Sequence, residues 1–421
     1  MLQRKSLHQV ILLALFFLMF SGKYFGQDKN TLEFYLTTAE KNSPLLNDYN
    51  NRIFSSKIDS LKQRADFGFK VNGIADASYS PQFNGWGYDG NSTINGNNLA
   101  LLGRVSRDFL GKDNLNTRLQ NFSLIIQQIL NQKKLSVLNL KRAITEQYIL
   151  AYSAQEQFAI DKEIIHILDQ EDIILKKLTQ ASVFKQTDYL TFKVMHQQSL
   201  LNQKQHEADW QNNYAALQYL SGLVSTDFKK LSAPNIENTG DLDFTKTVYA
   251  DSFKTDSLKL ANDIKIINYD YKPKVSAFAD GGYSSALIHT PYKNFGVSVG
   301  LSLTVPIYDG HQRKMLIEQK VIETDTKTKY LKYTENQYLQ QINLIRNQMQ
   351  QYQELLKIAR TQMKYSQTLI EANLKQLPTG DVRMVDFILS ITNYTTLKTG
   401  ILQYENNLLR LQNNLSNLIV Q

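Results

Sequence analysis

The sequence contains no cysteine. This absence excludes a disulfide framework, a thiolate metal site and a cysteine nucleophile. Proline is scarce as well, at seven of 421 residues, whereas glutamine and asparagine are abundant. Because proline is the residue that most strongly interrupts a helix, this composition favours long exposed helices over a compact, loop-rich enzyme.

Long apolar runs are also missing, apart from one short run near the N-terminus. Val10–Phe20 comprises eleven apolar residues preceded by Arg4 and Lys5, whereas a membrane helix needs about 20. The pattern predicts a secretory signal peptide over residues 1–26, with cleavage near Gly26. No later run approaches about 18 apolar residues, so the exported chain is expected to be either soluble or a β-barrel.

The sequence has no run of like charge, although its net charge is +8. Scattered charges are typical of a solvated helix surface and argue against a nucleic-acid partner. No Ser/His/Asp arrangement, nucleotide-binding loop or paired-carboxylate signature is present. The histidines after the predicted signal peptide lack metal-ligand spacing: His166, His196, His206, His289 and His311. We expect no enzyme activity, no cofactor and no metal site.

What is present is a long alternating stretch, Phe295–Gly310. Strict alternation of apolar and small or polar residues predicts a strand with one apolar face and one wet face. The apolar positions are Phe295, Val297, Val299, Leu301, Leu303, Val305 and Ile307. The stretch exceeds the roughly 5–6 residues of a typical strand in a soluble protein and the roughly 9–11 residues that cross a membrane.

Three further segments alternate in the same way: Val71–Gln82, Leu99–Phe109 and Val275–Tyr283. We expect two β-hairpins, over residues 70–110 and 273–310, each with a loop at its tip.

Most of the remaining chain has helical periodicity. Helices are expected over residues 31–69, with a break at Ser43-Pro44, and over 112–178, which holds no glycine or proline. Further helices are expected from about 187 to 220, from 245 to 272, from 311 to 375 and from 381 to the end. Several of these show apolar residues in alternating steps of four and three, the seam of a coiled coil.

The two halves of the sequence match in order and in detail. Ala75-Asp76 and Tyr79-Ser80 recur as Ala279-Asp280 and Tyr283-Ser284, which indicates an internal duplication. The expected segments are the signal peptide (1–26), helices (27–69), a β-hairpin (70–110), a helical hairpin (111–221), a connector with a helix (222–272), a second β-hairpin (273–310) and a second helical hairpin (311–421).

Four strands cannot close a barrel, and lipid does not tolerate an open sheet edge. Two chains would supply eight strands and an interior filled by side chains, whereas three would supply twelve strands and leave an aqueous lumen. Small and polar residues on the wet face favour three. The candidate lumen residues are Asp76, Asp280, Ser298, Ser302 and Thr304. The helical hairpins would prolong the same tube beyond the membrane.

This order of elements resembles the TolC family of outer membrane efflux channels. The residues that carry the resemblance are Leu32–Leu46, Pro273–Tyr283, Val305–Gly310 and the tips of the helical hairpins. It implies an α+β membrane protein: a homotrimer with a twelve-stranded β-barrel in the outer membrane, four strands from each chain, continuous with an α-helical coiled-coil tunnel in the periplasm.

The resemblance also implies a function. The tunnel would dock a periplasmic adaptor and an inner-membrane pump of the RND or ABC type, and would serve as a passive exit duct for drugs, metals or proteins. Those three cargoes stay open, because the inner-membrane partner chooses among them.

The family places a glycine in each hairpin tip, followed six residues later by an aspartate. Gly380 and Asp386 match this pattern, and Ser182 and Asp188 occupy the corresponding positions in the first repeat. The resemblance makes Asp386 and Asp188 candidates for the periplasmic gate, although Leu389 stands at the family's second acidic ring and Val382 where an arginine is common. The candidate adaptor-docking residues are Ser182, Val183, Phe184, Thr379, Gly380 and Asp381.

Several alternatives stand beside these hypotheses. Asp76 and Asp280 are alternatively ordinary residues of the wet face, and Trp86, Tyr88 and Tyr292 are either residues of a membrane interface or residues of the loop tips. The chain as a whole is alternatively a secreted or surface coiled-coil protein without a pore, or, with less support, a periplasmic enzyme. Asp386 alternatively serves only to stabilise a helix N-terminus through the helix dipole.

Overall fold

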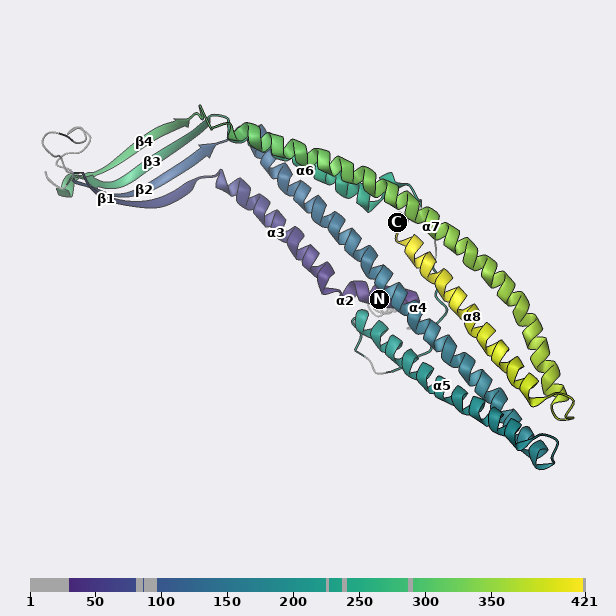
Figure 1. Cartoon of the computed structure of the whole chain (residues 1–421). Helices are drawn as coiled ribbons and strands as arrows, with labels where there is room; N and C mark the ends of the chain where they lie inside the picture. Colours follow the sequence, from purple (N-terminus) through teal and green to yellow (C-terminus); the bar gives the residue numbers. More distant parts are fainter. Residues whose placement is uncertain are drawn as a thin grey trace, which may run out of the picture.

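The computed structural model describes residues 30–80, 86, 97–224, 227–236, 241–286 and 291–418. The expected signal peptide lies outside these residues. The molecule is a long rod with a small β-sheet at one end and the turns of two helical hairpins at the other (Figure 1).

The sheet contains four antiparallel strands in the order β1-β2-β3-β4. These are β1 (Lys70–Tyr79), β2 (Asn97–Phe109), β3 (Lys274–Ser285) and β4 (Phe295–Thr304). β2 pairs with β3 and so joins the two halves of the sequence, with Arg104 opposite Asp280. β1 and β4 are the edges of the sheet.

β4 ends earlier than the alternating pattern predicts. Its last paired residue is Thr304, opposite Lys274, the first residue of β3. Pro306 follows two residues later and has no N–H to continue the ladder. The apolar alternation therefore extends beyond the end of the hydrogen-bonded strand.

The break expected near Ser43 is present. α2 (Leu32–Asn42) ends where α3 (Pro44–Asp66) begins. The Ser43 hydroxyl accepts a bond from the Leu46 N–H at the start of α3, and Pro44 occupies the first helical position, where its missing N–H costs nothing. Thr31 caps α2 in the same manner.

Two helices run the length of the rod, and α3 and three further shorter helices lie beside them. The long ones are α4 (Lys112–Gln180) and α7 (Gln312–Gln376). The three further helices are α5 (Gln186–Leu220), α6 (Val248–Asp270) and α8 (Met384–Ser416). Two short 3-10 turns, η2 (Phe244–Lys246) and η3 (Pro291–Lys293), complete the described elements.

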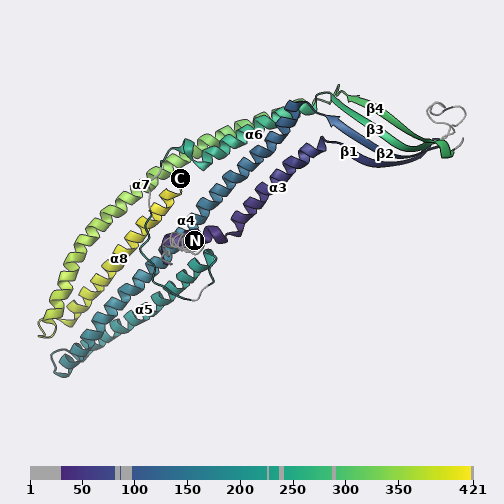
Figure 2. The same ribbon diagram turned by 180° about the vertical axis from the view of Figure 1, so that it is seen from behind.

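The helices lie side by side in a fixed order. Near the sheet the order is α3, α4, α6, α7, and near the tips it is α5, α4, α8, α7 (Figures 1 and 2). Hydrogen bonds join neighbours at both levels: Lys133 to Asn50 and Lys327 to Asp256 near the sheet, and Tyr394 to Glu163 near the tips. The rod is thus one layer of helices, four wide.

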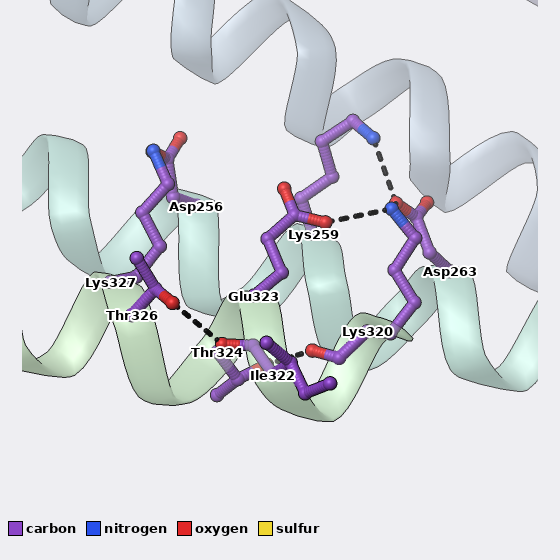
Figure 3. Close-up of polar contacts among 9 residues, drawn as sticks. All are labelled: Asp256, Lys259, Asp263, Lys320, Ile322, Glu323, Thr324, Thr326 and Lys327. Atoms are coloured by element: carbon purple, nitrogen blue, oxygen red, sulfur yellow. Dashed lines mark hydrogen bonds and ion pairs between the residues drawn. The ribbon is translucent and has the colours of Figure 1, made fainter. Parts of the chain in front are cut away.

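Charged side chains join α6 to α7 (Figure 3). The Asp263 carboxylate accepts from Lys259 Nζ at 3.0 Å on its own helix and lies 3.8 Å from Lys320 Nζ on α7. Lys320 also pairs with Glu323 at 3.0 Å. Solvent-exposed pairs contribute at most about 1 kcal/mol each, so this network mainly fixes how the two helices lie against each other.

The apolar core is divided along the rod. The cluster nearest the tips, which we call the tip core, joins α4, α5, the end of α7 and α8 through Leu168, Leu175, Phe192, Leu377, Met384 and Phe387, all at most 2% exposed. A second cluster surrounds Tyr35, Tyr148 and Tyr214 at mid-length. Burial and the hydrogen bond to the Tyr214 hydroxyl raise the pKa of Tyr35.

Candidate functional site

The register sorts the strand side chains onto two chemically different faces. Residues with even numbers share one face, because Asp76 lies opposite Ala100, Arg104 opposite Asp280 and Asp280 opposite Ser298. This polar face carries all of the sequence-predicted lumen candidates: Asp76, Asp280, Ser298, Ser302 and Thr304. Ile74, Leu102 and Phe278 are its large apolar members.

The opposite face is apolar and exposed. On β4 the exposed fraction is 89% for Val297, 84% for Val299 and 78% for Leu301, and Val71 on β1 is 75% exposed. A contiguous apolar surface of this kind is unfavourable in water and requires an apolar cover.

Aromatic side chains lie at both ends of this apolar face. Tyr283 and Phe295 form an edge-to-face pair at the loop end, with ring centroids 5.3 Å apart. At the helix end the Arg107 guanidinium lies over the Phe69 and Phe109 rings, 5.0 and 5.8 Å from their centroids. Two such bands are typical of strands that cross a bilayer. Tyr283, Phe295 and Phe109 lie within the alternating segments of the sequence, but their grouping into two bands was not predicted.

The polar face contains an ion pair that the sequence reasoning missed. Arg104 Nε donates to Asp280 Oδ1 at 2.6 Å, and its Nη2 donates to Oδ2 at 2.7 Å. Asp280 was a candidate site residue, but its partner is 176 residues away in the chain. Only the β2–β3 register identifies the pair.

The two hairpin tips have the same backbone geometry. Ser182 and Gly380 adopt left-handed conformations, with φ of 62° and 76°. The Val183 N–H donates to Leu178 O at 2.9 Å, and the Asp381 N–H donates to Gln376 O at 3.2 Å. Both bonds close a Schellman motif, in which the residue after the left-handed position reaches back over the last helical turn.

The six candidate docking residues lie in these two turns, and the turns touch. A Cβ on Gly380 would lie 2.9 Å from Val183 Cγ1. Phe184 packs against the tip core, to which Leu377 and Val382 belong. The residue at the family's arginine position, Val382, is therefore buried beneath the tips at 8% exposure.

The candidate gate residues occupy equivalent positions in the first turns of α5 and α8. Arg383 donates to both carboxylate oxygens of Asp386, at 2.7 and 2.9 Å, and this hydrogen bonding raises the pKa of Arg383. Lys185 stands at the corresponding N-cap of α5, but Asp188 has no ion pair within the part of the chain that the structure describes. The ion pair of Arg383 with Asp386 was not predicted, although Arg383 directly follows Val382, the residue at the family's arginine position.

The described residues contain no group of three or more His, Cys, Asp or Glu side chains that would hold a metal ion. None of the helices in the described ranges is both long enough and apolar enough to span a bilayer.

Known structures share this fold. The outer-membrane channel OprN is 13% identical with a TM-score of 0.75, and the match covers 93% of this chain and 90% of that one. The outer membrane protein VceC of Vibrio cholerae is 13% identical with a TM-score of 0.73, covering 91% and 94%. The open-state outer membrane channel MtrE of Neisseria gonorrhoeae is 10% identical with a TM-score of 0.73, covering 92% and 88%.

No protein-family model matches the sequence, and no curated protein matches it. At these identities the structural likeness establishes the fold, and at that level the resemblance to the TolC family is confirmed.

The left-handed tip positions lead to a prediction. Replacing Ser182 by glycine removes the steric cost of a side chain at φ 62° and should stabilise the first tip by about 1 kcal/mol, or about fivefold in amide protection. Gly380→Ala should have the opposite effect, because its Cβ would also collide with Val183. Hydrogen exchange at the Val183 and Asp381 amides measures both changes. Equal exchange in all three proteins would contradict the assigned strain.

Proposed function

We propose that this chain is one subunit of a trimeric outer-membrane channel that serves as the passive exit duct of an efflux or secretion system. The observation that carries the proposal is that the described residues form a single layer, with four strands in the sheet and four helices side by side in the rod, so that it ends in a lateral edge on each side. Such a layer is complete only when further copies close it into a tube.

The edges of the sheet demand this closure most strongly. β1 and β4 each carry unpaired backbone N–H and C=O groups along one side, and lipid offers these groups no partner. Pairing β4 of one chain with β1 of the next satisfies both edges. Three chains give twelve strands and a lumen lined by the polar faces, and two would give eight strands with a filled interior.

The helical edges carry matching apolar stripes. On α5 the stripe is Leu190, Val194 and Leu201, 53%, 71% and 64% exposed. On α7 it is Leu355, Ile358, Tyr365 and Leu369, 41%, 66%, 74% and 50% exposed. Both follow coiled-coil spacing, so α7 of one subunit can pack against α5 of its neighbour in the same ring.

The apolar face of the sheet then meets outer-membrane lipid between its two aromatic bands. Each edge strand has ten residues, which matches the roughly 9–11 residues of a tilted membrane strand. The helical part extends into the periplasm, where the tips that contain Ser182 and Gly380 dock a periplasmic adaptor and, through it, an inner-membrane pump. The shared tip geometry supports an internal two-fold repeat.

A secreted coiled-coil protein without a pore explains the apolar helix stripes but not the sheet. An exposed apolar face flanked by aromatic bands is unfavourable on a rod surrounded by water, so this alternative is not favoured.

The trimer is testable because the chain has no native cysteine. In the double variant Val194→Cys/Leu369→Cys, oxidation should link α5 of each subunit to α7 of the next. Denaturing electrophoresis without reductant should show dimers and trimers, and no larger species, because the ring closes. Each single-cysteine variant is the matched control and should remain monomeric. A ladder beyond the trimer, or no cross-link, would argue against a closed ring of three.

The channel itself is tested in planar bilayers. Purified full-length protein should insert and produce discrete conductance steps of uniform size. A protein that stays soluble without detergent and never conducts would instead support the pore-free coiled-coil alternative.

The gate assignment predicts a charge effect at the tips. Asp386→Asn should weaken the block of the channel by divalent cations applied from the tip side by about threefold, because it removes a carboxylate from the entrance. Arg383→Gln should strengthen the block, since it frees the Asp386 carboxylate from its ion pair. If neither variant alters conductance or block, Asp386 merely stabilises the start of α8.

A further inference from the structure

Arg104 is a charged side chain of the polar face that the proposed function does not yet use. It projects from the middle of β2 and is held by the bidentate pair with Asp280 on the adjacent strand. The two partners differ in exposure: the Arg104 side chain is 37% exposed and the Asp280 side chain only 7%. A solute that moves along the polar face therefore meets the guanidinium far more than the carboxylate.

A second contact fixes the guanidinium in position. Arg104 Cζ lies 4.8 Å from the centroid of the Phe278 ring, a cation–π geometry. The far end of the Phe278 ring in turn lies over Gly300 on β4, where a Cβ would approach Phe278 Cζ to 2.4 Å. Residues on three strands thus hold the Arg104 guanidinium in place. Asp280 orients it by hydrogen bonds, the Phe278 ring packs against it, and Gly300 leaves room for that ring.

The other charges of the polar face are arranged differently. Lys274, opposite Thr304, is a further cation at the helix end of the sheet. Lys70 and Asp108 lie 3.9 Å apart nearer the helices, and both are about half exposed at 45% and 55%. Asp76 lies on β1, two same-face positions from Asn72, the residue opposite Arg104. Without Arg104, both Asp280 and Asp76 would face the lumen with no cation between them.

We propose that Arg104 sets the charge preference of the barrel, favouring anionic solutes over cations. This proposal rests on the proposed channel, in which three subunits bring three copies of Arg104 to one level of the lumen. A ring of fixed charges at one level of a pore is an established way of selecting ions by sign. Asp280 is a positioning residue in this arrangement, since its carboxylate acts by orienting the guanidinium.

The test is the chloride-to-potassium permeability ratio, obtained from reversal potentials of single channels in a KCl gradient. Arg104→Gln should lower this ratio by about twofold or more, because it leaves the carboxylates uncompensated. Asp280→Asn should raise it, because the guanidinium loses its counter-charge. Arg104→Lys should retain most of the original ratio. Opposite shifts from the two partners are the signature of a selectivity role.

Arg107→Gln is the matched control, since it removes the same charge from the same strand on the apolar face, beside Phe69 and Phe109. Its permeability ratio should equal that of the original protein. If Arg104→Gln and Asp280→Asn leave the ratio unchanged or shift it in the same direction, the pair is only structural and the proposal is wrong. That outcome differs from failure of the proposed function, in which the unaltered protein does not conduct at all.

Discussion

The unpaired hydrogen-bonding groups at the two edges of the sheet are the constraint on which the rest of the structure depends. A four-stranded antiparallel sheet with one apolar face is stable in water only if that face is covered, and stable in lipid only if its edges are paired. The valines of β4 are exposed, so the described part of one chain does not cover its own apolar face. In the proposed trimer both demands are met, because lipid covers the apolar face and each copy pairs its sheet edge with that of the next.

The layer of helices continues the two lateral edges of the sheet along the rod. α4 and α7 run the whole rod, while α3, α5, α6 and α8 are shorter and lie beside one of them. The layer therefore keeps a width of four elements although its members change at mid-length. Ser43, which caps the start of α3, and the left-handed Gly222, which follows the end of α5, lie where this exchange takes place, and the Asn42 side chain donates to Gly222 O.

The polar face combines small residues with one charged group, the Arg104 guanidinium, that is held in a fixed position. Glycine and serine on β4 leave open space, and Phe278 fills part of it by lying across Gly300. That ring and the Asp280 carboxylate leave the Arg104 guanidinium little freedom, so its charge occupies one place on the wall rather than an average over many rotamers. The tips use the same principle, with Arg383 held against Asp386.

The sequence by itself determined the features that depend on neighbouring residues: the alternation of β4, the break at Ser43-Pro44, the uninterrupted α4 and the sorting of Asp76 and Ser298 onto a wet face. Periodicity and capping act over a few residues and are therefore visible in a single sequence. Only the tertiary structure decided the end of β4 at Thr304, the pairing of Arg104 with Asp280 and the contact of Val183 with Gly380. The last two features depend on contacts between segments nearly half the chain apart, and the end of β4 depends on where β3 begins, opposite Thr304. Local pattern carries no information about which residue will stand opposite which.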